Sequence, residues 1–258
     1  MSTLYLSDLD GTLFGLDGKL SDESARILGG AVARGCLFSV ATARSPVTAV
    51  PLLRALPLKL PAVLMNGVLL THLDTSENVS VETIPADIAA RVCELFTAAD
   101  REPFVYTLRD GHPAVEYRRL YNRHDQEFCA MRKDRYRYFD KVEQFDLSSP
   151  VIYINVVDTH DRLAPIFDAL QSVAGIGSTL YEDNYCAGRF FLEVFSAAAT
   201  KENGMRKLKG YTGASRVFAF GDNVNDIGML RAADDSAAVA NAYEEAKAAR
   251  ALRHRSKQ

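Results

Sequence analysis

The run Asp8-Leu-Asp-Gly-Thr-Leu13 follows directly on a short apolar segment that begins at Leu4. An apolar run of this length before an abrupt change to acidic residues predicts a buried strand that ends at Asp8. Asp8 and Asp10 are two residues apart, so they share a face of that extended backbone. Two carboxylates this close repel each other unless a cation lies between them, and Mg²⁺ prefers oxygen ligands. The run therefore predicts a metal site, although paired acids at a strand end can also be solvated loop residues.

Strands and helices alternate along the first third of the chain, as in a parallel sheet with crossover helices. Beyond the first strand, we expect a helix after Ser21, a strand at 37–41, a helix at 46–56 and a strand at 62–65. This order predicts a doubly wound, Rossmann-like α/β core. The three strands end at Asp8, Thr42 and Asn66, and ligands of such sheets gather at these strand ends.

A second cluster of acids and amides, Gly221-Asp-Asn-Val-Asn-Asp226, follows the strand expected at 216–220. Asp222 is positioned to complete the metal site begun by the first strand. The same cluster can also form a turn and cap a helix that begins near Ile227. Both interpretations of the cluster stand on the sequence alone.

Two further positions could bind an anion such as a phosphate group. Lys201 begins a helix expected over 200–209, and its ammonium group could reach a phosphate or a carboxylate. Thr42 precedes Ala43, so its hydroxyl and the next backbone N–H could hold phosphate oxygens. Considered singly, a lysine near a helix start is commonly solvated, and a threonine there is commonly a helix cap.

The middle of the chain changes character, because its strands pair with each other. The segment 104–111 ends in Asp110-Gly111, which marks a turn, and the segment 114–117 follows it. This pattern predicts a hairpin. We expect an inserted α+β module over residues 79–186, and a core domain made of residues 1–78 and 187–258. The basic stretch 131–138 is interleaved with aspartate, which favours a solvated face over a nucleic-acid surface.

Composition excludes several classes of protein. A length of 258 residues with 48% hydrophobic residues is enough for a full buried core. The formal net charge of −3 provides no field that would attract nucleic acid or an anionic membrane. The four cysteines show no zinc-ligand spacing and are expected to be ordinary reduced thiols. Without a signal-like start or a long apolar run, a cytoplasmic protein is predicted.

At four places the sequence resembles the haloacid dehalogenase (HAD) superfamily of phosphatases, in particular its Cof-type members with a type IIB cap. The family's four motifs correspond to Asp8-Leu-Asp-Gly-Thr-Leu13, Thr42, Lys201 and Gly221-Asp-Asn-Val-Asn-Asp226. The type IIB cap is inserted between the second and third motifs, where the α+β module is expected. Two positions depart from the family pattern, since Ala43 and Glu202 stand where glycine is usual.

The resemblance implies a set of roles. Asp8 attacks phosphorus to form an aspartyl-phosphate, and Asp10 acts as general acid and then general base. Mg²⁺ is held by Asp8, the backbone carbonyl of Asp10 and Asp222, and Asp226 supports the metal shell. The phosphate-binding groups that it implies are Thr42, Lys201, Asn225 and the backbone N–H groups around Leu9 and Ala43.

Together with the resemblance, these features predict a magnesium-dependent phosphatase that hydrolyses a small phosphorylated metabolite, such as a sugar phosphate. The inserted module is then a cap domain that sets substrate specificity, and neither nucleic acid nor a membrane is a partner. A phosphomutase or phosphotransferase that uses the same phosphoaspartate is the alternative. A non-catalytic sensor on the same fold is a further alternative, but such proteins usually lack the nucleophile or a metal carboxylate, and both are present here.

Overall fold

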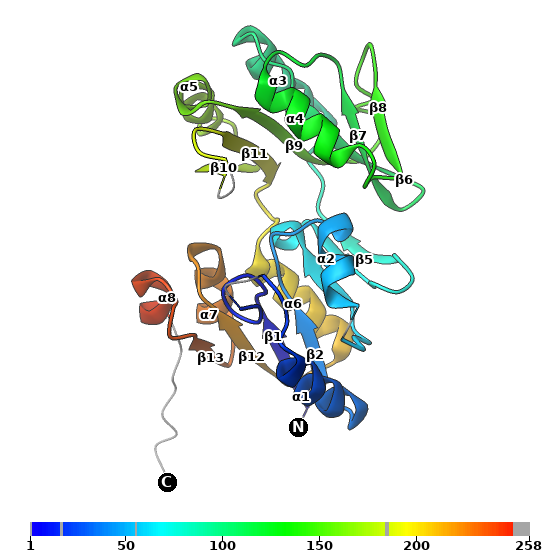
Figure 1. Cartoon of the computed structure of the whole chain (residues 1–258), viewed down its shortest axis with the longest axis vertical. Helices are drawn as coiled ribbons and strands as arrows, with labels where there is room; N and C mark the ends of the chain where they lie inside the picture. The colour runs from blue at the N-terminus through cyan, green and yellow to red at the C-terminus, as the bar shows by residue number, and fades with distance from the viewer. Residues whose placement is uncertain (1, 16–17, 55, 184–185, 250–258) are drawn as a thin grey trace. The chain divides into compact units, whose positions relative to one another are not determined.

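The computed structural model describes residues 2–15, 18–54, 56–183 and 186–249, which fall into two compact units (Figure 1). The first unit comprises Met1–Val81 and Ala199–Gln258, and the second unit comprises Glu82–Ala198. The chain leaves the first unit once and returns to it once. The second unit is therefore a single insertion into the first.

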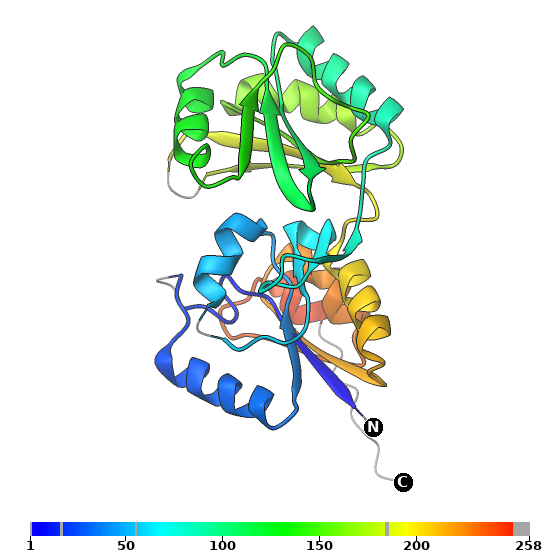
Figure 2. The same ribbon diagram turned by 90° about the vertical axis from the view of Figure 1, so that its right-hand side faces the viewer.

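A parallel sheet with the strand order β13-β12-β1-β2 forms the centre of the first unit. Its strands are β1 (Thr3–Ser7), β2 (Leu37–Val40), β12 (Arg216–Gly221) and β13 (Asp235–Ala238). In Figure 2 these strands run between α1 (Asp22–Ala33) on one side and α6 (Lys201–Thr212) on the other. Parallel sheets need helices on both faces because both faces are apolar. The prediction of a doubly wound α/β core is confirmed.

The strand expected at 62–65 joins a second, antiparallel sheet of the first unit. That sheet consists of β3 (Ala62–Leu64), β4 (Leu69–Thr71) and β5 (Asn78–Val81). β3 adjoins β2 through a parallel bridge between Ala41 and Val63, and the Thr42 N–H donates to the Val63 carbonyl at 2.9 Å. β3 therefore connects the two sheets and places the segment after it beside the end of β2.

The helices of the first unit include α1 and α6, each of which begins after a side-chain cap. Besides α1 and α6, they are α2 (Pro46–Leu53), α7 (Ile227–Ala232), α8 (Glu244–Ala249) and the 3₁₀ turns η1 (Met65–Gly67) and η2 (Val224–Asp226). Ser21 caps α1 by accepting from the Ser24 N–H at 3.1 Å. Leu4 and Leu6 of β1 pack with Met205 and Leu208 of α6 in the main core cluster. This packing fixes the start of α6 relative to the strand ends.

The second unit contains a six-stranded sheet in the order β10-β11-β9-β6-β7-β8. Its strands are β6 (Phe104–Arg109), β7 (His112–Tyr117), β8 (Tyr138–Lys141), β9 (Val151–Asp158), β10 (Ile176–Glu182) and β11 (Phe190–Ser196). Neighbouring strands are antiparallel except β7 and β8. The hairpin predicted at Asp110-Gly111 is confirmed, and both residues have the positive φ that its tight turn needs.

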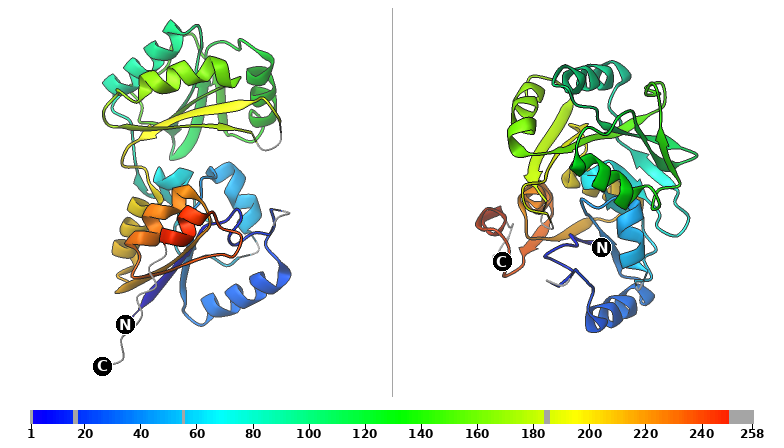
Figure 3. Two further views of the ribbon diagram at one scale, coloured as in Figure 1. Left: turned by 90° about the vertical axis from the view of Figure 1, so that its left-hand side faces the viewer. Right: turned by 45° about the horizontal axis from the view of Figure 1, so that its top comes forward.

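The helices of the second unit cover different faces of this sheet. They are α3 (Ala86–Ala98), α4 (Arg123–Arg132) and α5 (His160–Leu170). α3 and α5 lie side by side (Figure 3) and pack on the face that carries Val105, Ile154 and Leu192. Because side chains alternate along a strand, Phe104 and Phe191 face the other way, and there they contact Phe128 of α4.

The structure differs from the predicted domain boundary on the C-terminal side. The sequence assigned residues 187–198 to the core domain, but β11 pairs with β9 and β10 in the sheet of the second unit. The pattern Phe190-Phe-Leu-Glu-Val-Phe195 suits a buried strand in either sheet, so only the long-range pairing decides its place. On the N-terminal side, the predicted boundary at 78 lies close to the observed one at Val81. None of the helices in the described ranges is long and apolar enough to span a membrane.

Candidate active and metal site

Three buried aspartates from two separate parts of the sequence converge at the ends of β1 and β12. Each of Asp8, Asp222 and Asp226 offers a carboxylate oxygen, and these oxygens all lie within 4.8 Å of one another. Asp8 follows β1, Asp222 follows β12, and Asp226 lies in η2 just beyond. β1 and β12 are adjacent and parallel, with Ser7 opposite Phe220, which brings their following residues side by side. This register brings together the first and fourth predicted motifs.

Lys201 joins two of these aspartates. Its ammonium group, at the first residue of α6, donates to Asp8 Oδ1 at 2.6 Å and to Asp226 Oδ1 at 2.7 Å. Its side chain is only 1% exposed, so both ion pairs are shielded from water. The alternative that Lys201 is a solvated surface lysine is wrong.

Asp226 shapes the loop that carries Asp222. Its Oδ2 accepts from the backbone N–H groups of Asp222 and Asn223, each at 3.0 Å, while its Oδ1 is bound by Lys201. Asn223 caps the 3₁₀ turn η2, whereas α7, the helix expected near Ile227, has no side-chain cap hydrogen bond from the residues that the structure describes. With both oxygens of Asp226 engaged, Asp8 and Asp222 have the freer carboxylate oxygens.

The turn after β1 closes tightly over Asp222. Thr12 donates from its hydroxyl to Asp222 Oδ1 at 2.7 Å. Gly11 has φ +84°, and a Cβ built on it would overlap the Asp222 carboxylate. A side chain at position 11 would therefore fill the space against the aspartate cluster, which explains the glycine in Asp-x-Asp-Gly.

The electrostatics of the cluster are those of an incompletely neutralised acidic site. Burial raises the pKa of Asp8 from 3.8 to about 7, with Lys201 opposing and Asp226 reinforcing the shift. Burial alone would lower the pKa of the Lys201 ammonium, but the charges of Asp8 and Asp226 outweigh it and the pKa is raised. One lysine faces three carboxylates. A hard divalent cation bound by carboxylate oxygens fits this donor set, and the residues present therefore suit Mg²⁺.

Asp10 lies apart from the three clustered aspartates. Its carboxylate is 49% exposed and is held at both oxygens by Arg44, with Arg44 Nε at 2.7 Å and Nη2 at 2.6 Å. A bidentate pair of this kind fixes the orientation of the carboxylate. The Asp10 side chain is consequently free of the metal cluster and directed by a second charged residue.

Besides Lys201, four residues were predicted to bind phosphate, and they lie at or just beyond the ends of the strands. They are Leu9, Thr42, Ala43 and Asn225. Thr42 is 1% exposed and its hydroxyl accepts from the Arg44 N–H at 3.1 Å, while Ala43 between them is exposed. Leu9 is buried next to Asp8. Asn225 is exposed in η2 and donates to the Asn66 side chain at 3.0 Å. Asn66 lies in η1, just after β3, and has φ +55°.

The site combines an acidic run after the first strand, a buried lysine and a second acidic run after a later strand. The chain that carries these features also matches a known family model. The model, described as haloacid dehalogenase-like hydrolase, matches residues 5–253. The chain belongs to the haloacid dehalogenase-like hydrolase family. The resemblance drawn from the four motifs is confirmed.

Two curated relatives of this HAD-like hydrolase match along most of its length. A provisionally named phosphatase of Haemophilus influenzae is 27% identical, over 96% of this chain and 91% of its own. A chloroplastic protein of Arabidopsis thaliana, named endoribonuclease YBEY, is 25% identical over 93% of this chain. The match spans only 42% of the Arabidopsis protein.

Solved structures share the fold of this HAD-like hydrolase. A phosphatase of the HAD superfamily from Bacteroides thetaiotaomicron superposes with a TM-score of 0.75 at 21% identity, covering 97% of this chain and 88% of its own. A structure described as a HAD subclass IIB sugar phosphatase gives a TM-score of 0.66 at 20% identity, covering 97% and 92%.

Two contacts in this site were missed at the level of sequence. Thr12 lies within the first predicted motif and Arg44 lies two residues after the second, Thr42, which is the signal that could have drawn attention to them. Their partners, Asp222 and Asp10, lie 2.7 Å or less away but belong to other segments of the chain. Only the strand pairing brings each pair together.

Proposed function

We propose that this HAD-like hydrolase is a magnesium-dependent phosphatase of small phosphorylated metabolites, with Asp8 as nucleophile. The observation that carries the proposal is the convergence of Asp8, Asp222 and Asp226, with carboxylate oxygens within 4.8 Å of one another and Lys201 bound to two of them. The phosphatases among its relatives and structural neighbours support the same class of reaction.

In the first step, a carboxylate oxygen of Asp8 attacks phosphorus and the bond from phosphorus to the leaving oxygen breaks. Lys201 restricts the Asp8 carboxylate to one orientation by donating a hydrogen bond to it at 2.6 Å. Asp10 gives its proton to the leaving oxygen, so the alcohol departs neutral. When bound by Asp8, Asp222 and the Asp10 carbonyl, Mg²⁺ supplies positive charge that offsets repulsion between the nucleophile and the phosphate.

In the second step, Asp10 takes a proton from water, the water oxygen attacks phosphorus, and Asp8 leaves as a carboxylate with release of inorganic phosphate. One residue can serve both steps because it loses its proton in the first and regains one in the second. Arg44 supports this role, since it holds both oxygens of Asp10 and so fixes the orientation of the carboxylate.

Charge on the phosphoryl oxygens is balanced by groups that are already oriented. Lys201, the Thr42 hydroxyl and the Asn225 amide, with the backbone N–H groups near Leu9 and Ala43, form the proposed binding set. Thr42 is buried and Lys201 is ion-paired, so neither needs to reorganise when phosphate enters.

We assign the second unit the role of a cap domain that selects the leaving group. Its place as one insertion between Thr42 and Lys201, and the structural similarity to a subclass IIB sugar phosphatase, support this role and favour sugar phosphates as substrates. The predicted cytoplasmic location stays a prediction.

The test is release of inorganic phosphate from a panel of sugar, nucleotide and cofactor phosphates, with Mg²⁺ and without any acceptor molecule. The proposal expects Mg²⁺-dependent release from at least one sugar monophosphate, and no release after chelation. Isomerised product without free phosphate would indicate a mutase. No turnover of any phosphomonoester, unchanged in Asp8→Asn, would indicate a non-catalytic protein.

A further inference from the structure

A second group of metal-ligating side chains lies in the second unit, outside the phosphatase site. His124, Glu127 and Cys186 each offer one ligand atom, and these atoms all lie within 4.8 Å of one another. All three side chains are half-buried, which keeps the group accessible to an ion from solution. The ligands of a tetrahedral zinc lie roughly 3.5 Å apart given bond lengths of about 2.0 to 2.3 Å. Side-chain rotations that shorten the distances between these ligand atoms by on the order of 1 Å would complete such a site.

Two of the ligands stand on a well-anchored helix. His124 and Glu127 are three residues apart on α4, so they share one face of it. Asn122 caps α4 by accepting from the Asp125 N–H at 2.9 Å, and its amide donates to the Val157 carbonyl of β9 at 3.3 Å. The start of α4, where both ligands lie, is therefore fixed to the sheet.

The third ligand lies in the connection between β10 and β11, which is closed by backbone hydrogen bonds. The Asp183 N–H donates to the Arg189 carbonyl at 2.7 Å, and the Arg189 N–H donates to the Cys186 carbonyl at 3.1 Å. Cys186 is a free thiol. Its position is thus set by the turn, and a metal would join this turn to α4.

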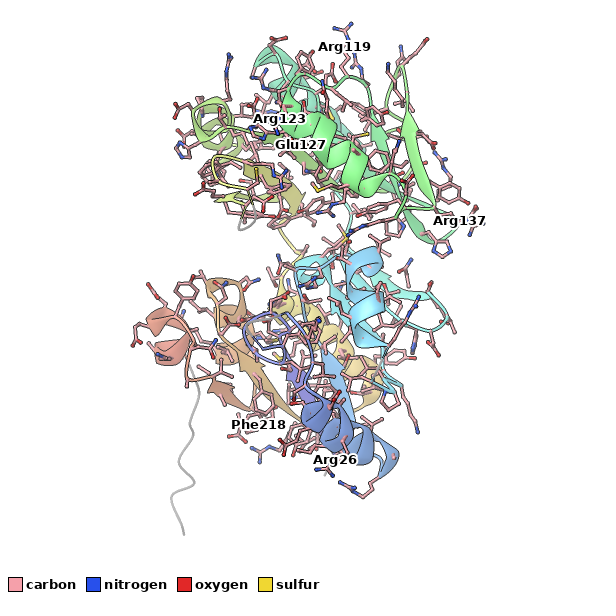
Figure 4. The ribbon with its side chains drawn as sticks, viewed as in Figure 1. Arg26, Arg119, Arg123, Glu127, Arg137 and Phe218 are labelled. Atoms are coloured by element: carbon pink, nitrogen blue, oxygen red, sulfur yellow. The ribbon has the colours of Figure 1, made fainter. Side chains whose placement is uncertain are left out.

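Arginines orient the carboxylate without excluding a cation. Glu127 accepts from Arg123 at 2.6 Å and from Arg189 at 3.4 Å (Arg123 and Glu127 are labelled in Figure 4). The charge of Arg189 is matched by Asp183, with which it forms a closer ion pair at 2.6 Å. Arg123 is 86% exposed, so water screens its charge. Hydrogen bonds of this kind to a ligating carboxylate are the usual support of a metal site.

His124 provides an independent sign that a partner belongs here. Its Nδ1 is buried and has no hydrogen-bond partner in the described part of the chain. Buried polar atoms in native proteins almost always have a partner. A metal bound through Nδ1 of His124 would give this atom the partner that it lacks.

We propose that His124, Glu127 and Cys186 form a zinc site in the second unit, with a fourth position left for water. Thiolate and imidazole ligands together select Zn²⁺ over Mg²⁺, which takes oxygen ligands. Binding deprotonates the Cys186 thiol and releases that proton to solvent. The two ligands on α4 and the one on the β10–β11 connection are then held together, so the ion ties these elements of the second unit.

Cobalt titration of the whole metal-free protein tests the proposal by spectrum. Co²⁺ bound to Cys186 gives thiolate-to-cobalt charge-transfer absorption, whereas Co²⁺ at the all-oxygen aspartate site gives none. We expect one thiolate-bound cobalt per chain, displaced by Zn²⁺, and loss of the band in Cys186→Ser and His124→Gln but not in Cys36→Ser or His112→Gln. Glu127→Gln should weaken binding by at least about 10-fold. No charge-transfer band, or a band that persists in Cys186→Ser, overturns the proposal.

Alkylation of the unmodified protein gives a second test that needs no variant. Cys36 and Cys186 are both half-buried free thiols, one in each unit, and serve as a matched pair. With iodoacetamide and peptide mass mapping, Zn²⁺ should slow modification of Cys186 by 10-fold or more and leave the rate at Cys36 unchanged. Equal rates at Cys186 with and without Zn²⁺ would contradict the site.

Discussion

The cluster in the first unit is assembled from the ends of separate strands, whereas the cluster in the second unit comes from one helix and one connection. Asp8, Asp222 and Asp226 are buried, and Asp8 and Asp226 share a lysine that is 1% exposed, so the three form a low-dielectric acidic site. His124, Glu127 and Cys186 are half-buried, and the arginine nearest to Glu127 is largely exposed. The first environment shifts charge states strongly and suits catalysis, while the second suits a bound ion that stabilises structure.

The largest expected effect concerns Asp8, the proposed nucleophile in the first unit. Asp8→Asn should lower kcat by on the order of 10⁴-fold or more, because it removes the attacking carboxylate and retains nearly the same volume. Phosphate release from the best substrate of the panel measures it. Asp22→Asn, at the exposed first turn of α1, is the matched control and should keep wild-type rates. Near-normal turnover by Asp8→Asn would contradict a covalent mechanism.

The second effect contrasts a buried cation with an exposed one. Lys201→Met leaves Asp8 and Asp226 without their shared partner, and breaking a buried ion pair costs about 3–5 kcal/mol. Urea unfolding of the metal-free protein measures the loss. Arg123→Gln in the second unit removes a solvated ion pair and should leave the urea midpoint close to wild type. Equal losses of stability in the two variants would contradict the claim that the first ion pair is shielded from water and the second is not.

The third effect concerns Arg44, which holds Asp10, the proposed general acid and base. Arg44→Gln should lower kcat by about 10² because Asp10 loses its bidentate support and with it the correct position. The deficit should be larger for substrates with poor leaving groups, which need protonation most. Arg54→Gln, on the exposed end of the next helix, is the control. A deficit independent of the leaving group would assign Arg44 a structural role instead.

The smallest effect is the number of protons released when Mg²⁺ binds to the aspartate cluster. Burial raises the pKa of Asp8 to about 7, so at pH 7 the metal-free protein carries a partly protonated carboxyl there. Mg²⁺ favours the ionised form, and its binding should release a fraction of a proton at pH 7 and almost none at pH 9. Calorimetry in buffers of different ionisation enthalpy measures the release.

The same shift sets the sign of a pH effect on stability. The folded pKa of Asp8 lies above the unfolded value of 3.8, so the folded chain binds more protons between those values. This stability contribution is fully present below pH 3.8 and is lost as the pH rises through about 7. Saturating Mg²⁺ should flatten that decline, and a decline unaffected by Mg²⁺ would place the ion elsewhere.

Sequence predicted that Asp8 and Asp222 would lie close together because both follow strand ends. Asp8 and Asp222 follow apolar runs, and parallel strands bring such ends to one edge regardless of their separation in the chain. The ion pair between Arg44 and Asp10 was not predictable, since it depends on the distance between two loops. β11 was assigned to the wrong domain because its pattern of buried residues fits either sheet.

The cluster in the second unit was invisible for a different reason. Cys186 has no histidine or cysteine nearby in the sequence, so it was interpreted as an ordinary thiol. It meets His124 and Glu127 only because α4 packs on one part of the sheet and the β10–β11 connection reaches the same place. Metal sites whose ligands come from distant segments leave no spacing signal.

The central claim is that Asp8 becomes phosphorylated during turnover. The direct measurement uses Asp10→Asn, in which hydrolysis of the intermediate lacks its general base, with Mg²⁺ and a radiolabelled aryl phosphate whose leaving group needs little protonation. After acid quenching and peptide mapping, the label should lie on the peptide that contains Asp8 and be removed by hydroxylamine. Label on a different residue, or steady release of phosphate with no label on the protein, would contradict the account.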